Sequence, residues 1–159
     1  LSDGQNKWVI MSSHKERRQI QLRQIPVIQK KAGPKSVLVV DDEPSILKLL
    51  FEILCKRLGY ETETAGTGEE AIDKLTRRDY DVIFLDIRMP MLSGKVLLEI
   101  LRTMDEELPN RVIFCTGDSF NPETQAFLEQ HKNLCLSKPF GLRDVELILD
   151  EFFKRKRPA

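Results

Sequence analysis

Five polar side chains stand just after short apolar runs of this 159-residue sequence, and their types suit phosphoryl chemistry. Asp41 and Asp42 follow the first run, Asp86 the third, Thr116 the fourth and Lys138 the fifth. Carboxylates that lie close together repel one another, and Mg²⁺ resolves this conflict because it prefers oxygen ligands. One carboxylate beside Mg²⁺ and an ammonium group can then act as a nucleophile and become an aspartyl phosphate. This chemistry requires a fold that brings the five residues together.

The five apolar runs alternate with amphipathic helical patterns, which indicates an α/β fold. The predicted strands are residues 36–40, 60–65, 81–85, 111–115 and 134–136, and the helical apolar positions fall within 46–58, 71–75, 96–104, 126–128 and 145–153. Short apolar strands that alternate with such helices form a parallel sheet covered on both faces. The sequence therefore predicts a doubly wound, five-stranded parallel sheet. Such sheets bind ligands beyond the carboxyl ends of their strands, where the five polar residues stand.

Residues with a preference for helix ends support these boundaries. Pro44 is placed to open the first helix and Gly59 to close it. Thr67 and Glu70 have the spacing of a capping box at the start of the second helix. Asn121 is predicted to cap the fourth helix.

The composition excludes several classes of protein. With 41% hydrophobic and 31% charged residues, the chain has the composition of a soluble globular protein. No apolar run approaches the roughly 20 residues of a membrane span, and no signal peptide is visible. Cys55, Cys115 and Cys135 stand singly without a CxxC motif, so neither a disulfide framework nor a zinc site is expected. We therefore expect a cytoplasmic location and no membrane contact by this segment.

The charges are divided unequally along the chain. Residues 1–35 hold eight Lys or Arg and two Asp or Glu, whereas residues 36–159 hold 17 and 23. This shift, next to Gly33-Pro34, predicts a domain boundary. The predicted parts are a basic linker or extension over 1–35, a globular domain over 36–154 and a basic tail over 155–159.

The basic extension contains two conflicting local patterns. Ser13 and Glu16 have capping-box spacing ahead of a helix, but the apolar residues between 20 and 27 fit a strand equally well. A solvated linker accounts for the positive charge, and no nucleic-acid-binding motif is present. No specific nucleic-acid partner is therefore expected.

Four motifs at strand ends carry a resemblance to a known family. They are VLVVDDEP at 37–44, DVIFLDIRMPMLSG at 81–94, VIFCTG at 112–117 and SKPF at 137–140. With these motifs in this order, residues 36–153 resemble a response-regulator receiver domain of two-component signalling. The resemblance implies the flavodoxin-like receiver fold of five βα units.

The resemblance also implies a phosphoacceptor and a metal site. Asp86 is implied to be the phosphorylated residue and Mg²⁺ the cofactor. Asp41 and Asp42 correspond to the acidic pair that holds the metal, with Asp42 and Asp86 as direct ligands. The backbone carbonyl of Arg88 is implied as the third protein ligand, and its side chain is expected to point to solvent.

Two further residues complete the implied catalytic set, and one position departs from the family pattern. Thr116 resembles the switch hydroxyl that turns toward the phosphoryl group. Lys138 resembles the lysine that pairs with a phosphoryl oxygen, and its bond to Pro139 is cis in the family, which would aim the lysine inward. The family often has Tyr or Phe where this chain has Cys135. Phosphorylation does not need that ring, but the aromatic part of the switch is not expected here.

The function implied is that of a phosphoacceptor module in a phosphorelay. The partner would be a histidine kinase or a phosphotransfer protein that presents phosphohistidine. The domain would catalyse its own Mg²⁺-dependent phosphorylation and dephosphorylation, and the phosphoryl group would switch its protein–protein contacts. Association into a homodimer stays open.

Several alternatives remain at this point. The chain could be a stand-alone receiver or the C-terminal receiver of a hybrid sensor histidine kinase, and the stretch at 116–129 favours the hybrid. Kinase activity would belong only to such a longer protein. A phosphate-independent receiver-fold scaffold is the alternative function. A phosphatase of the haloacid dehalogenase type is disfavoured, because Arg88 stands where that family has its second aspartate.

Overall fold

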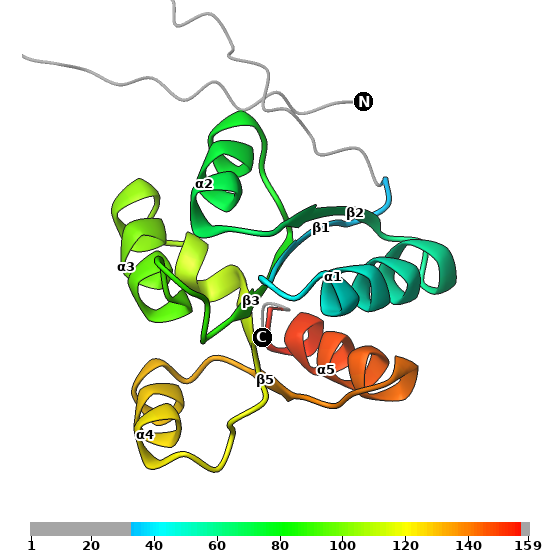
Figure 1. Cartoon of the computed structure of the whole chain (residues 1–159). Helices are drawn as coiled ribbons and strands as arrows, with labels where there is room; N and C mark the ends of the chain where they lie inside the picture. The colour runs from blue at the N-terminus through cyan, green and yellow to red at the C-terminus, as the bar shows by residue number, and fades with distance from the viewer. Residues whose placement is uncertain (1–32, 157–159) are drawn as a thin grey trace, which may run out of the picture. The chain divides into compact units, whose positions relative to one another are not determined.

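Five parallel strands form the sheet of the computed structural model, which describes residues 33–156. The strands are β1 Ser36–Val40, β2 Glu61–Ala65, β3 Val82–Asp86, β4 Val112–Thr116 and β5 Cys135–Ser137. Their order across the sheet is β2-β1-β3-β4-β5 (Figure 1). The doubly wound fold predicted from the sequence is thereby confirmed. The predictions for Ser13, Glu16 and residues 20–27 lie outside the described residues.

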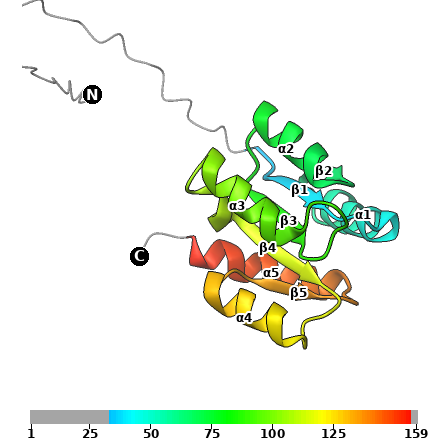
Figure 2. The same ribbon diagram turned by 60° about the vertical axis from the view of Figure 1, so that its left-hand side comes forward.

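Helices cover both faces of the sheet. They are α1 Pro44–Phe51, its π-helical continuation η1 Glu52–Arg57, α2 Gly68–Arg77, α3 Gly94–Met104, the 3₁₀ helix η2 Leu108–Arg111, α4 Pro122–His131 and α5 Leu142–Arg155. Figures 1 and 2 show α1 and α5 on one face and α2, α3 and α4 on the other. The side chains of β1 alternate between the two faces of the sheet, so each face carries apolar residues that the helices cover. Leu38 and Val40 pack in the core under α2 and α3, and Val37 and Val39 pack in the core under α1 and α5.

The first helix departs from the regular α-helix that its sequence pattern predicts. Its second half has the π pattern, in which the N–H of Leu58 donates to the carbonyl of Ile53 at 3.0 Å. Ile53 and Leu54 stay buried, so hydrophobic periodicity alone could not reveal the change in hydrogen bonding. The predicted end is confirmed: Gly59 adopts φ +73°, a left-handed conformation that favours glycine.

The capping signals are confirmed with one difference. The side chain of Asn121 accepts from the N–H groups of Glu123 and Thr124 at the start of α4. The Thr67 hydroxyl accepts from the N–H of Glu70, but the Glu70 carboxylate accepts from Gly66 instead of from Thr67. Only one of the two bonds of the predicted capping box is therefore formed.

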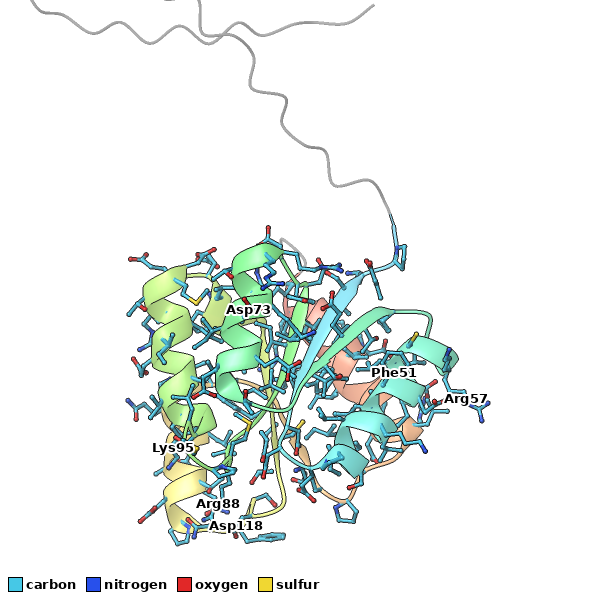
Figure 3. The ribbon with its side chains drawn as sticks, turned by 45° about the horizontal axis from the view of Figure 1, so that its top comes forward. Phe51, Arg57, Asp73, Arg88, Lys95 and Asp118 are labelled. Atoms are coloured by element: carbon cyan, nitrogen blue, oxygen red, sulfur yellow. The ribbon has the colours of Figure 1, made fainter. Side chains whose placement is uncertain are left out.

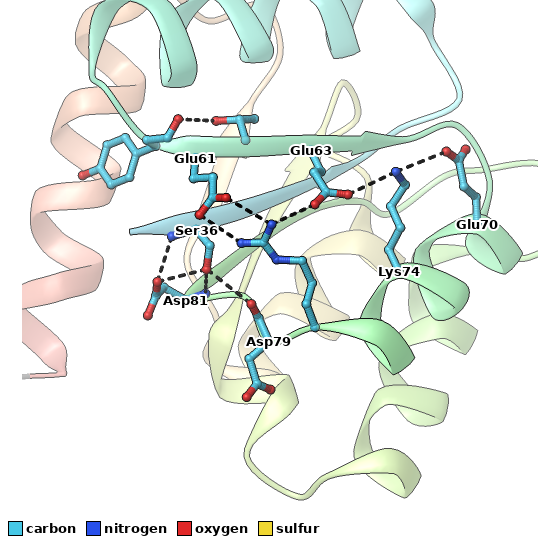
Figure 4. A network of polar contacts seen from close by, with 10 residues as sticks. Ser36, Glu61, Glu63, Glu70, Lys74, Asp79 and Asp81 are labelled. Atoms are coloured by element: carbon cyan, nitrogen blue, oxygen red, sulfur yellow. Dashed lines mark hydrogen bonds and ion pairs between the residues drawn. The ribbon is translucent and has the colours of Figure 1, made fainter. Parts of the chain in front are cut away.

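The edge strand β2 carries charged side chains that pair with α2 and with the residue after it. Arg78 binds Glu61 and Glu63 at 3.1 and 3.0 Å, and Lys74 binds Glu63 at 3.3 Å (Figure 4). Lys74 also lies 3.8 Å from Glu70. We call these five residues the β2 network. It places two cations among three carboxylates at a partly exposed surface.

Candidate functional site

The parallel register brings the ends of β1, β3, β4 and β5 to one edge of the sheet. Backbone hydrogen bonds continue past the strands: the N–H of Lys138 donates to the carbonyl of Thr116 at 2.8 Å. Asp86 is paired with Cys115 in the ladder, and Val40, directly before Asp41, is paired with Leu85. Asp86 and Thr116 are the last residues of their strands, one position further than the sequence predicted. The four segments thus deliver their polar residues to one place.

Asp41, Asp42 and Asp86 form an acidic cluster at this edge. One carboxylate oxygen from each lies within 4.8 Å of the others. Asp41 and Asp86 are 1% and 4% exposed, whereas Asp42 is exposed to solvent. Burial, followed by the charge of Asp41, raises the pKa of Asp86 to about 6, against the opposing effects of Lys138 and a backbone hydrogen bond from Arg88. The cluster therefore holds negative charge at a high electrostatic cost.

Lys138 is the cation that faces the acidic cluster. Its Nζ lies 2.8 Å from Asp41 Oδ2, 2.9 Å from Glu43 Oε1 and 3.8 Å from Asp86 Oδ1. Burial alone would lower the pKa of Lys138, but its hydrogen bonds to Asp41 and Glu43 outweigh burial and raise that pKa. The lysine is therefore charged at neutral pH. Its peptide bond to Pro139 is cis, as the resemblance implied.

Glu43 is a site residue to which the sequence assigned no role. It follows the acidic pair directly, but sequence proximity does not show that its side chain reaches Lys138, 95 residues further along the chain. Since Lys138 binds Asp41 and Glu43 at shorter distances than Asp86, the ammonium group is shared among three carboxylates. Of the three carboxylates, Asp86 makes the longest contact with the Lys138 ammonium.

The donor set of the acidic cluster fits a hard divalent cation. Its three carboxylates come from two adjacent strand ends, and one of them is open to solvent. Mg²⁺ usually binds one or two protein carboxylates and keeps several waters, so a half-open cluster of oxygens suits it. A single lysine leaves this cluster with excess negative charge, which a divalent ion would compensate.

A glycine after β3 is required by the packing around Asp86. A Cβ atom at Gly94 would lie 2.2 Å from the backbone carbonyl oxygen of Asp86 and 2.9 Å from the Cα of Ile87. The N–H of Gly94 also donates to the carbonyl of Ile87 at 3.1 Å. The start of α3 therefore packs directly against the backbone that carries Asp86.

Thr116 and Arg88 are turned toward the loop after β4. The Thr116 hydroxyl accepts from the N–H of Asp118 at 3.0 Å, and within residues 33–156 it forms no hydrogen bond to Asp86. The prediction that the Arg88 side chain points to solvent is confirmed by its 58% exposure, and the structure adds an ion pair with Asp118 (Figure 3). The sequence could not show this pair because it joins two different loops.

Cys135 lies half-buried on β5 against the core that includes Phe127. Burial raises the pKa of its thiol to about 11, so the thiol is neutral at physiological pH. Cys115 is fully buried on β4. Neither cysteine has the environment of a reactive thiolate.

Comparison with known proteins decides the family. Residues 37–150 match the model of the response regulator receiver domain. The chain belongs to this family. The receiver domain is 35% identical over 123 residues to the sensor histidine kinase RcsC of Escherichia coli K12, covering 77% of this chain and 13% of RcsC. It is 34% identical over 125 residues to the transcriptional regulatory protein PhoP of Bacillus subtilis, covering 79% of this chain and 51% of PhoP.

Solved structures agree with the family. The chemotaxis protein CheY4 of Vibrio cholerae matches with a TM-score of 0.68 and 29% identity, covering 76% of this chain and 99% of CheY4. The response regulator TrrA of Thermotoga maritima, in complex with Mg²⁺-BeF, matches with a TM-score of 0.63 and 32% identity, covering 74% and 98%. The receiver domain is therefore a phosphoacceptor module of the two-component type, and its family works with histidine kinases or phosphotransfer proteins.

The described part of the chain contains no helix that is both long and apolar enough to span a bilayer. The domain spans about an eighth of RcsC and about half of PhoP.

Proposed function

We propose that Asp86 accepts a phosphoryl group from phosphohistidine of a histidine kinase or phosphotransfer protein. A carboxylate oxygen of Asp86 attacks phosphorus, the P–N bond of the donor breaks, and its electron pair returns to the imidazole nitrogen. The observation that carries this proposal is the placement of Asp86, which lies buried beside Asp41 and has the weakest contact with Lys138. Its carboxylate is thus in the site without being fully neutralised there.

Mg²⁺ is the proposed cofactor, held by Asp42, Asp86 and the backbone carbonyl of Arg88, with Asp41 beside them. The proximity of the three carboxylates supports this assignment, as does the Mg²⁺-BeF complex of the related TrrA. When bound, Mg²⁺ neutralises carboxylate and phosphoryl charge and so favours attack by one anion on another.

Lys138 and Thr116 are proposed to recognise the product. The Lys138 ammonium lies 3.8 Å from Asp86 and can pair with a phosphoryl oxygen formed there. The Thr116 hydroxyl would turn from Asp118 toward the same group. This turn would change the loop before α4 and with it the surface offered to partners.

The proposal is tested by phosphotransfer with Mg²⁺, read by intact mass. We expect candidate kinases, or acetyl phosphate as a small donor, to add the mass of one phosphoryl group to the wild type. Asp86→Asn should add none, because an amide is not a nucleophile of this kind. Asp150→Asn changes an exposed aspartate of α5 and should react like the wild type. An unchanged mass with every donor would contradict the proposal and favour the scaffold function.

Removal of the metal gives a second test. Excess chelator should abolish the mass gain, and added Mg²⁺ should restore it, because one lysine cannot neutralise the acidic cluster and the incoming phosphoryl group together. Undiminished transfer in chelator would contradict the metal assignment while leaving Asp86 as the acceptor.

We further propose that the domain works in a cytoplasmic hybrid sensor kinase, and the similarity to RcsC supports this setting. The similarity to PhoP is nearly as high, so the coding sequence around the domain is the decisive observation. We expect a kinase core upstream. A DNA-binding domain next to the receiver would contradict the hybrid. The division into an extension over 1–35, a receiver over 36–154 and a tail over 155–159 stays a prediction.

A further inference from the structure

An ion pair joins the two loops that follow β3 and β4. Arg88 lies two residues after Asp86, and Asp118 lies two residues after Thr116 (Figure 3). Their side chains are 58% and 40% exposed. Within residues 33–156 Arg88 makes no other ion pair, so its guanidinium pairs with the loop after β4 alone.

The main chain of Asp118 links this ion pair to the Thr116 hydroxyl. The N–H of Asp118 donates to Thr116 Oγ1 at 3.0 Å, and the carbonyl of Asp118 accepts from the N–H of Asn121 at 3.1 Å. Thr116 is 1% exposed, so its hydroxyl has no bulk water as an alternative partner. Asp118 is thus fixed at three points: by Arg88, by Thr116 and by the N-cap of α4.

We propose that Arg88 and Asp118 are positioning residues whose ion pair keeps the Asp118 amide on the Thr116 hydroxyl and so opposes the turn of Thr116 toward Asp86. This inference rests on the proposed function. The turn carries the hydroxyl oxygen away from the Asp118 N–H, so this hydrogen bond is lost when the side chain turns. The ion pair holds the loop after β4 to the loop after β3, which keeps the N–H in place and adds to what the turn must overcome.

The size of the effect follows from exposure. An ion pair this open to solvent contributes little, so breaking it should shift the equilibrium between the two loop arrangements roughly two- to fivefold. The shift should therefore tighten the binding of a ligand that requires the Thr116 hydroxyl to face Asp86. The backbone carbonyl of Arg88 is retained in any side-chain substitution, so the proposed metal ligand is not removed.

Beryllofluoride with Mg²⁺, a stand-in for the phosphoryl group, measures this equilibrium by fluorescence or NMR titration. We expect Arg88→Ala and Asp118→Ala each to tighten its binding roughly two- to fivefold. The double variant should add little to either single change, and Arg88→Asp with Asp118→Arg should restore the wild-type value. Arg102→Ala is the matched control, because Arg102 forms a similarly exposed pair with Glu99 on α3. It should leave binding unchanged.

Three outcomes of this titration would overturn the inference. If Arg88→Ala weakens binding while Asp118→Ala strengthens it, the Arg88 charge acts directly on the anion and does not position the loop. If the two single effects add in the double variant, or if Arg102→Ala has the same effect, the ion pair is not the cause.

Amide exchange in the unmodified protein gives a test that does not require phosphorylation or metal. The N–H of Asp118 should exchange roughly two- to fivefold faster in Arg88→Ala than in the wild type or in Arg102→Ala. Equal exchange rates in all three would contradict the inference. If the wild type binds no beryllofluoride but Asp118 exchange still responds to Arg88, the proposed function fails while the positioning role stands.

Discussion

In the β2 network three glutamates face two basic side chains, whereas at the acidic cluster a single lysine is shared by Asp41, Asp86 and Glu43. Burial alone would raise the pKa of Glu63, but the hydrogen bond from Lys74 and the charges of Lys74 and Arg78 outweigh burial and lower it. At Asp86 burial and the neighbouring Asp41 prevail, and the pKa rises to about 6.

The opposite pKa shifts of Glu63 and Asp86 show that the acidic cluster, and not the β2 network, lowers the stability of the fold. Pairing in the β2 network is local, since α2 and the residue after it supply the cations to the adjacent edge strand. The acidic cluster is gathered by the sheet from distant segments, and it keeps more negative charge than its own lysine compensates. Uncompensated buried charge is typical of a functional site rather than of a structural ion-pair network. Substitutions made in each region test this contrast.

The largest difference should come from two glycines, Gly94 beside the acidic cluster and Gly68 on α2, the helix that supplies Lys74 to the β2 network. Gly94→Ala places a Cβ against the backbone carbonyl of Asp86, which cannot move without moving β3, so we expect a loss of about 3 kcal/mol. Gly68→Ala at the start of α2 meets only the Leu92 side chain, which can change its rotamer, so about 1 kcal/mol is expected. Urea denaturation measures both. Equal losses would show that the backbone at Asp86 is not closely packed.

Removing one carboxylate from each region should act in opposite directions. Without metal at neutral pH, Asp86→Asn should increase the free energy of unfolding by about 1–3 kcal/mol, because it removes a buried charge. Glu63→Gln should reduce it by about 0.5–1 kcal/mol, because it weakens partly exposed ion pairs. Saturating Mg²⁺ should narrow the gap between Asp86→Asn and the wild type. A loss of stability in Asp86→Asn would contradict the electrostatic account of the cluster.

The difference in the free energy of unfolding between Asp86→Asn and the wild type should depend on pH. Above pH 6 the Asp86 carboxylate is charged in both the folded and the unfolded chain, so the wild type carries its full penalty of up to about 3 kcal/mol. As pH falls from 6 toward the ordinary value of 3.8, the folded chain binds a proton that the unfolded chain does not, and the penalty disappears. The stability of Asp86→Asn and of the wild type should therefore converge in acid. A gap that widens in acid would contradict the raised pKa.

Salt should produce the smallest effect, and mainly in the β2 network. Arg78→Gln should cost about 0.5 kcal/mol at low ionic strength, and most of this difference should vanish near 1 M salt, because partly exposed pairs are screened. The gap between Asp86→Asn and the wild type should respond less, because the acidic cluster is largely buried. If salt changed the stability differences of Arg78→Gln and of Asp86→Asn equally, the distinction between the two regions would be contradicted.

Much of the fold and the site followed from the sequence, and the reason is geometric. Parallel strands end at one edge, so alternating apolar runs already placed Asp41, Asp86, Thr116 and Lys138 near one another. Strand periodicity does not fix strand ends to one residue, which is why β3 and β4 end one position later than predicted.

What escaped prediction depends on side chains from different segments. The contact of Glu43 with Lys138 and that of Arg88 with Asp118 require the conformations of loops, which no local pattern specifies. The π pattern of η1 escaped for another reason, since Ile53 stays buried in either kind of helix. Local periodicity therefore predicted the sheet and the edge at which the polar residues gather. It did not predict the side-chain contacts that determine the chemistry of the site.

Reductive trapping of the acyl phosphate tests the central claim most directly. The receiver is phosphorylated with Mg²⁺ and a small donor, the aspartyl phosphate is reduced with borohydride to homoserine, and the modified residue is located by peptide mass spectrometry. The account predicts homoserine at position 86 and none when Mg²⁺ is chelated. Homoserine at Asp41 or Asp42, or a phosphoryl group that resists reduction, would contradict it.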